Sequence, residues 1–211
     1  MKLPAALVFL LMIQQLSFKQ TQLQHSRVRL AYQEKESTVK NYFNQRNLNN
    51  QGAKLFLRAF KKEMKLEVWV QTKQQQAFQL LHTYDFCATS GRPGPKRKEG
   101  DSQIPEGIYY IKHFNPVSNF HLSLGLNYPS PGDASQGYKE GRITWAQYQA
   151  IKHAFAARTV PPWNTRLGGE IFIHGHGALY DWTRGCIALD DVDMRELYSL
   201  VDVGTPVTIV P

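Results

Sequence analysis

Hydrophobic and polar positions change their spacing along this chain, and each change marks a new structural element. Residues 26–50 carry apolar side chains among charged ones at the spacing of an amphipathic helix, which we expect to end in the Asn- and Gln-rich stretch 47–52. The spacing then changes to every second residue, as is typical of strands. Three strands are therefore predicted, over residues 55–57, 66–70 and 78–87.

The second half of the chain mixes strand and helix patterns. A Gly- and Pro-rich break at 91–95 opens a long charged loop. Residues 142–158 place their apolar side chains on one helix face, and a Pro-Pro pair after them prevents the helix from continuing. Asp190 and Asp191 precede a last helical segment, whose N-terminus we expect to be capped here. The other predicted strands are 108–111, 121–128, 170–175 and 206–210.

These elements predict a mostly β fold, a β-rich sandwich or barrel-like domain with a few helices. At 211 residues one domain is the natural expectation. We expect the β-rich domain to occupy residues 52–211 and a helical lead or linker to occupy residues 19–51. No internal repeat is visible in the sequence.

The N-terminus carries the pattern of an export signal. Lys2 precedes a short apolar stretch whose length suits a secretory h-region of roughly 7–15 residues. It is shorter than the ~20 apolar residues that span a bilayer. We therefore predict a signal peptide, or an uncleaved N-terminal anchor, over residues 1–18. The protein is expected to be exported.

The net charge of the chain bears on which kinds of partner molecule the protein binds. The chain has 25 Lys and Arg against 17 Asp and Glu, a formal net charge of +8. Clustered basic residues would suggest nucleic-acid binding, but here they are scattered, apart from the run at residues 96–98. We expect no nucleic-acid partner. For an exported protein, the charge favours a solvated surface or attraction to an anionic envelope polymer.

The candidate chemistry lies in residues 171–191, IFIHGHGALYDWTRGCIALDD. A predicted strand delivers His174 to its end, and Cys186 follows later, directly after Gly185. A free thiol with a pKa near 8.5 is mostly protonated at pH 7, and a nearby imidazole corrects this. A glycine before the cysteine lets a substrate approach the backbone, whose N–H groups can bind an oxyanion. The pattern indicates cysteine acyl transfer.

Three other interpretations of the same residues remain open at this point. In an exported protein, Cys87 and Cys186 can form a disulfide. The His-x-His pair with Cys186 can bind a metal ion, although a third fixed ligand is missing from the pattern. His174 can also be a core histidine that the backbone satisfies.

The order of these motifs resembles a known family. The IHG element followed by T-x-G-C-I-x-L is similar to the signature of the L,D-transpeptidase catalytic domain, the YkuD or ErfK family, whose members remodel peptidoglycan. The upstream stretch SGRPGPKRKEGDSQIPEG, residues 90–107, resembles the YafK-type murein L,D-transpeptidases in particular. The resemblance covers roughly residues 66–211.

The resemblance implies roles for individual residues. Cys186 matches the nucleophile that attacks a carbonyl of a tetrapeptide stem and releases the terminal D-alanine. His174 matches the general base, which the family orients through a backbone carbonyl, here that of Gly175. The positions around the nucleophile that match the family's oxyanion and orienting elements are Thr183, Arg184 and Gly185.

Other residues are weaker candidates, and one position departs from the family. His176 is the alternative base, and the rings of Tyr180 and Trp182 are candidates for a cleft wall. Lys96 and Lys98, with their neighbours Glu99 and Asp101, are candidates for holding the charged ends of a peptide stem, or form a solvated loop. The family commonly has Arg or Asn two residues after the nucleophile, where this chain has an alanine, Ala188.

The resemblance implies an exported enzyme in the periplasm or cell envelope of a bacterium. It is expected to form a thioester with a peptidoglycan stem, with a role in wall biogenesis or degradation and cell shape. Transfer to an amine makes it a transpeptidase, and transfer to water makes it a hydrolase that can release wall-linked protein. A non-catalytic wall-binding module is the alternative from another class. No metal or organic cofactor is expected. The expected partners are peptide stems and a wall-attached envelope protein, and we expect a monomer.

Overall fold

The computed structural model of the chain describes residues 18, 20–48, 52–73, 75–88 and 93–211. The predicted signal segment, apart from Phe18, and the first residues of the 90–107 motif lie outside the described residues. Among the described residues, no helix is both long and apolar enough to cross a bilayer.

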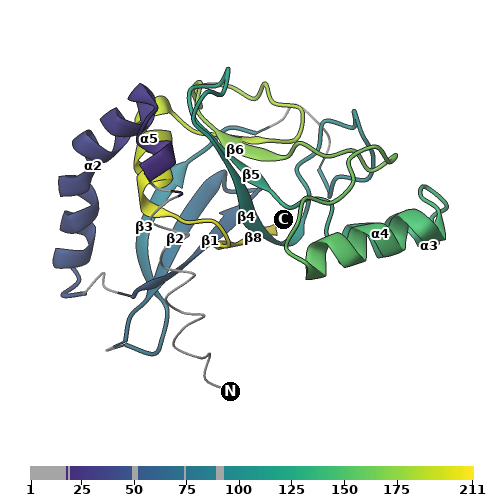
Figure 1. Cartoon of the computed structure of the whole chain (residues 1–211), viewed down its shortest axis with the longest axis horizontal. Coiled ribbons are helices and arrows are strands. Elements are labelled where there is room, and N and C mark those ends of the chain that lie inside the picture. Colours follow the sequence, from purple (N-terminus) through teal and green to yellow (C-terminus); the bar gives the residue numbers. More distant parts are fainter. Residues whose placement is uncertain (1–17, 19, 49–51, 74, 89–92) are drawn as a thin grey trace.

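The core of the molecule is one curled sheet of eight strands (Figure 1). In the order in which they hydrogen-bond, the strands run β3-β2-β1-β8-β4-β5-β6-β7. The pairs β1–β8 and β6–β7 are parallel, and the other neighbours are antiparallel. Their bounds are β1 Lys54–Phe60, β2 Lys65–Gln71, β3 Gln79–Asp85, β4 Gly107–Asn115, β5 Ser123–Leu126, β6 Phe172–His174, β7 Ile187–Ala188 and β8 Pro206–Val210.

The two ends of this sheet meet. Cys87, just beyond β3, forms an isolated antiparallel bridge with Ala188 of β7, and each N–H donates to the other residue's carbonyl at 2.9 Å. The sheet therefore curls until its first and last strands touch. The expected β-rich, barrel-like fold with a few helices and a helical N-terminal lead is confirmed.

Four described helices flank the sheet: α2 Ser26–Asn44, α3 Pro131–Lys139, α4 Trp145–Ala156 and α5 Asp191–Leu200. In Figure 1, α2 and α5 lie side by side at one side of the sheet, and α3 and α4 form a hairpin at the other. The helices predicted from spacing at 26–50, 142–158 and after Asp190 are confirmed, although α2 ends at Asn44, before the Asn-rich stretch.

Two local predictions differ from the structure. Helix α3 was not predicted because PGDASQG offers no apolar spacing; it begins instead at a capping box in which Ser130 and Asp133 bind each other's backbone N–H groups. Asp190 was expected to cap α5, but its side chain does not cap the helix. Its carboxylate accepts the N–H of Ala178 at 3.0 Å instead, so it fixes the loop that follows β6.

Helix α2 is held to the domain by a buried acidic side chain. Glu196 of α5, which is 5 % exposed, accepts the hydroxyl of Tyr42 from α2 at 2.7 Å and that of Tyr84 from β3 at 2.8 Å. Apolar residues of α2, among them Val28 and Phe43, join the main core around this carboxylate. The helical lead and the sheet therefore share one core.

We predict that Glu196→Ala destabilises the protein by about 2 kcal/mol, because it leaves the hydroxyls of Tyr42 and Tyr84 without their acceptor. Urea unfolding followed by circular dichroism measures the change. The control is Glu36→Ala on α2, which removes an exposed carboxylate that pairs with Lys40 of α2. This substitution is expected to change stability by less than about 0.5 kcal/mol. Equal effects of the two substitutions would contradict the anchoring role of Glu196.

Candidate active site

Strand pairing brings the two predicted catalytic residues to one face of the sheet. β6 and β7 are parallel, with Ile173 opposite Ile187 and His174 opposite Ala188. Side chains two residues apart along a strand point to the same face. Cys186 lies two residues before Ala188, directly before β7. It therefore shares a face with His174, which lies two residues further along β6 than the position opposite Cys186.

The imidazole of His174 is fixed by one hydrogen bond and two aromatic rings. Its Nδ1 lies 2.7 Å from the carbonyl oxygen of Gly175, so Nδ1 carries the proton and Nε2 keeps its lone pair. The ring stacks on Phe120, with centroids 4.7 Å apart and planes at 28°, and packs against Trp182 at 5.3 Å. Burial lowers the pKa of His174, and a nearby charge on His176 also lowers it, against the Gly175 hydrogen bond.

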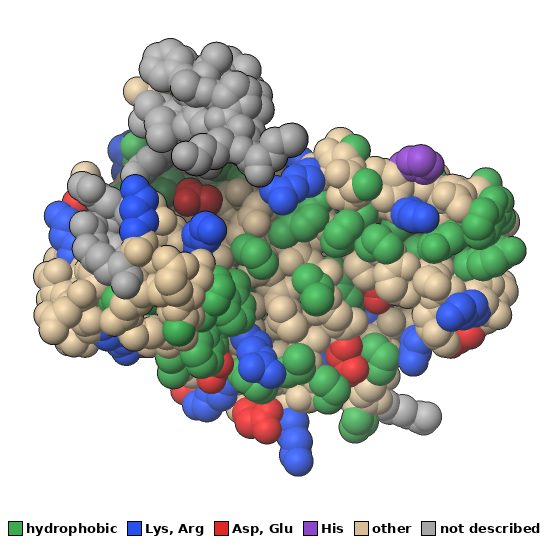
Figure 2. Space-filling view, turned by 90° about the horizontal axis from the view of Figure 1, so that it is seen from below, with side chains coloured by type: hydrophobic (Ala, Val, Ile, Leu, Met, Phe, Trp, Pro, Cys, Tyr) green, Lys and Arg blue, Asp and Glu red, His purple; other side chains and the backbone are tan. Residues whose placement is uncertain are grey.

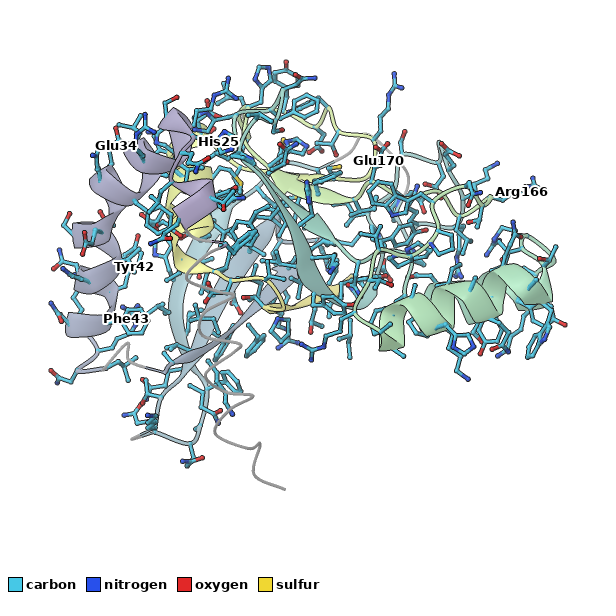
Figure 3. The ribbon with its side chains drawn as sticks, in the orientation of Figure 1. His25, Glu34, Tyr42, Phe43, Arg166 and Glu170 are labelled. Atoms are coloured by element: carbon cyan, nitrogen blue, oxygen red, sulfur yellow. The ribbon has the colours of Figure 1, made fainter. Side chains whose placement is uncertain are left out.

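Cys186 directly precedes β7, and its thiol lies next to Phe172, the first residue of the neighbouring strand β6. Sγ accepts the N–H of Phe172 at 3.4 Å and donates to the carbonyl of Glu170 at 3.6 Å. Figure 3 labels Glu170 beside β6, far from Tyr42 and Phe43 on α2. Burial raises the pKa of the Cys186 thiol to about 11, although the Phe172 N–H and the positive charge of Lys96 oppose the change.

These two pKa shifts define the resting state of the site. A thiol with a raised pKa and an imidazole with a lowered pKa are both neutral near pH 7. Within the described part of the chain no hydrogen bond joins the sulfur to His174. The arrangement provides a neutral nucleophile and a neutral base on one face, and it can support base-assisted attack of sulfur on a carbonyl.

Gly185 and Thr183 shape the backbone at Cys186. Gly185 has a φ of +121°, and a Cβ there would lie 2.6 Å from the carbonyl oxygen of Gln103. Thr183 is buried, and its hydroxyl donates to the carbonyl of Cys186 at 2.7 Å. Only a glycine fits the position before the cysteine, because any side chain would meet the backbone of the 93–107 loop.

The charged loop that presses on Gly185 is held by Asp101. Its carboxylate accepts the N–H groups of Arg97 at 2.6 Å, Lys98 at 2.8 Å and Gln103 at 3.2 Å. Burial opposes ionisation of Asp101, but these hydrogen bonds and the ammonium of Lys96 outweigh it and lower its pKa. The loop is therefore a folded element built around one carboxylate.

Lys96 belongs to the interior of this loop. Its side chain is 4 % exposed, and its Nζ donates to Asp101 at 3.1 Å and to the carbonyl of Lys98 at 2.9 Å. Lys96 therefore supplies a buried positive charge that favours the thiolate form of Cys186. The side chain of Lys98, in contrast, is exposed.

The other predicted site residues separate into two groups. Trp182 and His176 gather around His174: the ring of His176 lies 5.9 Å from Trp182, and its backbone N–H donates to Asp191 at 2.7 Å. Tyr180 and Arg184 are exposed on the loop between β6 and β7. The structure therefore brings His174, His176 and Trp182 together and leaves Tyr180 and Arg184 facing solvent.

Sequence reasoning missed Phe120. It lies in the loop between β4 and β5, packs against His174, and also contacts His176 at 6.0 Å and Trp182 at 5.4 Å between ring centroids. Its only sequence signal is an aromatic residue just before the predicted strand at 121–128, which gives no hint of a partner so distant in the sequence. The antiparallel pairing of β5 with β6 brings it to the site.

The structure bears on two of the alternatives to a nucleophilic cysteine. Cys87 and Cys186 are both free thiols, so the disulfide interpretation is wrong for this structure. Cys87 is buried, and its Sγ donates to the carbonyl of Gly177 at 3.5 Å. Among the described residues, no group of three or more His, Cys, Asp or Glu side chains is placed to hold a metal ion.

Comparison with known proteins agrees with this geometry. A family model of the L,D-transpeptidase catalytic domain, YkuD, matches residues 58–209, and the chain therefore belongs to this family. YafK of Escherichia coli (strain K12), a protein named as an L,D-transpeptidase, is 32 % identical over 90 residues, which cover 42 % of this chain and 36 % of YafK. The chain thus matches about a third of the length of that relative.

A solved structure has the same fold. The helical cell shape determining protein Pgp2 from Campylobacter jejuni superposes with a TM-score of 0.53 at 22 % sequence identity. The match covers 74 % of this chain and 47 % of Pgp2. At this identity the likeness supports the fold of the domain.

We predict that Gly185→Ala destabilises the protein by about 2 kcal/mol or more, because it combines a strained φ with a clash against the Gln103 carbonyl. The control is Gly141→Ala, where φ is +68° and no atom lies within 4 Å of the added Cβ, so strain acts alone. Thermal unfolding of both variants is the measurement. A smaller effect at Gly185 than at Gly141 would contradict the close approach.

Proposed function

We propose that the protein is a peptidoglycan-remodelling cysteine acyltransferase, an L,D-transpeptidase that forms a thioester between Cys186 and a tetrapeptide stem. The observation that carries this proposal is the placement of Cys186 and His174 on one face of β6 and β7, with Nδ1 of His174 bound to the Gly175 carbonyl. That bond leaves Nε2 free to accept a proton.

In the proposed first step, Nε2 of His174 takes the thiol proton while sulfur attacks the carbonyl carbon of the stem peptide. Rotation about the Cα–Cβ bond of Cys186 turns Sγ from the Glu170 carbonyl towards the imidazole, since catalytic hydrogen bonds often tighten only in the substrate complex. The C–N bond then breaks, and the imidazolium returns the proton to the departing amine of D-alanine. The thioester and a neutral His174 remain.

The oxyanion of the tetrahedral intermediate needs donors that are already in place. We assign this role to backbone N–H groups around Gly185 and Cys186, whose conformation is set by Gly185, the Gln103 carbonyl and the Thr183 hydroxyl. The buried charge of Lys96 supports developing negative charge at the sulfur. Binding of the charged ends of a stem by Lys98, a cleft wall formed by Tyr180 and Trp182, and an orienting role for Arg184 stay predictions.

In the second step the thioester passes to an acceptor. An amine gives a crosslink or attaches a wall-linked protein, and water gives hydrolysis, with His174 as the base in both cases. We propose the bacterial envelope as the place of action, where a net charge of +8 favours anionic polymers. On the face drawn in Figure 2, basic side chains are dispersed among polar and apolar ones, as a diffuse attraction requires.

The non-catalytic alternative rests on the alanine at position 188. Ala188 is fully buried in β7 and bonded to Cys87, so it serves the sheet and leaves no side chain towards a substrate. A binding module has no chemical need for a thiol and a correctly oriented imidazole on one face, and this pair favours the enzyme.

We predict a covalent adduct on Cys186 when the protein meets a disaccharide-tetrapeptide or a carbapenem, which acylates activated cysteines. Intact-mass spectrometry measures it. The adduct is expected to disappear in Cys186→Ala and to survive in Cys87→Ala, the matched control, whose thiol is buried and donates to the Gly177 carbonyl. If the wild-type protein stays unmodified with both probes, the proposal is wrong. Products formed with and without an added amine separate transfer from hydrolysis.

We predict that adduct formation rises with pH through the pKa of His174, because only the neutral imidazole accepts the thiol proton. Burial lowers the pKa of His174, so the midpoint of this rise is expected below the ordinary imidazole value of about 6.5. Adduct formation rates between pH 4 and pH 9 measure it, with circular dichroism as the control for folding. A midpoint above 6.5 would contradict a buried neutral base.

A further inference from the structure

The N-terminal helix reaches the candidate active site through one side chain. Arg27 of α2 lies outside the residues matched by the family model, 58–209. Its Nη1 donates to the carbonyl of Ser118 at 2.8 Å and to that of His121 at 2.9 Å. One guanidinium nitrogen therefore ties two backbone positions of the loop between β4 and β5.

These two carbonyls flank Phe120, which touches the catalytic base from two directions. The ring of Phe120 stacks on the imidazole of His174 at 4.7 Å. The carbonyl of Phe120 accepts the N–H of Gly175 at 3.1 Å, and the carbonyl of Gly175 holds Nδ1 of His174. The position of this one loop residue therefore affects both the burial and the orientation of the base.

Phe120 needs such a tether because its own burial is incomplete. The side chain is 40 % exposed, so packing alone fixes it less firmly than a core residue. Its N–H donates to the hydroxyl of Ser118 at 3.1 Å, a local contact that shapes the turn but does not attach it to the domain. Arg27 adds to the bond between Phe120 and Gly175 two further attachments on either side of Phe120, and its charged donor makes stronger hydrogen bonds to carbonyls than a neutral group does.

We propose that Arg27 is a positioning residue for the reaction: it holds the Phe120 loop against His174 and so keeps the base buried and correctly oriented. This inference rests on the proposed function, because it assigns His174 the role of base. Release of the loop admits water to the imidazole and frees its ring. Hydration raises the pKa of His174, since burial is the main cause of its lowering.

Replacing Arg27 removes a charge that acts on His121 and not on His174. The titratable groups on the segments packed here are His176 and Asp181 on the following loop, His121 beside Phe120, Asp191 on α5, and Cys186. The charge that acts on the pKa of His174 is that of His176, and Arg27 acts on His121. A shift in the pKa of His174 therefore reports the loop contact.

The test compares Arg27→Ala with Arg29→Ala on the full chain. Arg29 is the matched control because, among the described residues, its guanidinium bonds the carbonyls of Leu23 and Gln24, which lie in the turn just before α2. NMR titration of labelled histidine, with His174 assigned through His174→Gln, gives its pKa. The rate of carbapenem adduct formation gives the reactivity, and thermal unfolding reports stability.

We expect Arg27→Ala to raise the pKa of His174 towards its ordinary value. The same variant is expected to slow adduct formation about tenfold, since misplacing a reacting group by an ångström costs on the order of 100-fold. Arg29→Ala is expected to change neither quantity. If Arg27→Ala does not fold, Arg27→Gln, which keeps a long polar side chain but loses the charged fork, takes its place.

A second protein background, Phe120→Leu, tests whether the effect of Arg27 passes through the contact between Phe120 and His174. In Phe120→Leu protein the substitution at Arg27 is expected to have little further effect, because the contact it supports is already gone. Equal pKa and rate for the Arg27 and Arg29 variants would overturn the proposal, as would a slower rate with an unchanged His174 pKa. A shifted pKa in a protein that forms no adduct in any variant would reject the proposed function and leave the positioning role intact.

Discussion

The hydrogen bond from Nδ1 of His174 to the carbonyl of Gly175 is the contact on which the rest of the site depends. It fixes the tautomer, and it holds only if Gly175 itself cannot move. Gly175 is confined from several sides: its N–H donates to the carbonyls of Phe120 and Leu122, and a Cβ there would lie 2.5 Å from Asp191. The loop, the sheet and α5 therefore meet at one residue without a side chain.

Much of the fold follows from spacing, and the failures have physical causes. Period-two patterns located β1 to β3, and short apolar runs located β4, β5, β6 and β8, but β7 has two residues and no visible period. Helix α3 depends on a cap rather than on an apolar stripe. In the site, the neighbouring glycines and the thiol identified His174 and Cys186 from the sequence. Phe120, in contrast, becomes a neighbour of His174 only through the pairing of β5 and β6. Contacts made by tertiary structure leave little trace in a local pattern.

At Cys186, burial is opposed by the N–H of Phe172 and by the charge of Lys96. Burial keeps the thiol and the imidazole neutral, which protects Cys186 from indiscriminate reaction, because the thiolate is the reactive form. Lys96 opposes this effect from within a loop organised by Asp101. The charged segment at residues 96–107 resembles a solvated loop in the sequence. In the structure it is a folded element that packs against Gly185, the residue before Cys186.

The bridge between Cys87 and Ala188 has a consequence for how the molecule opens. An open sheet exposes unpaired edges, whereas this sheet is closed by a seam only a few residues long, and Cys186 lies next to it. A short seam is the place where a closed sheet separates at lowest cost in hydrogen bonds, since local opening follows the density of contacts. The backbone around Cys186 can therefore exchange its amides with solvent while the other strands stay paired.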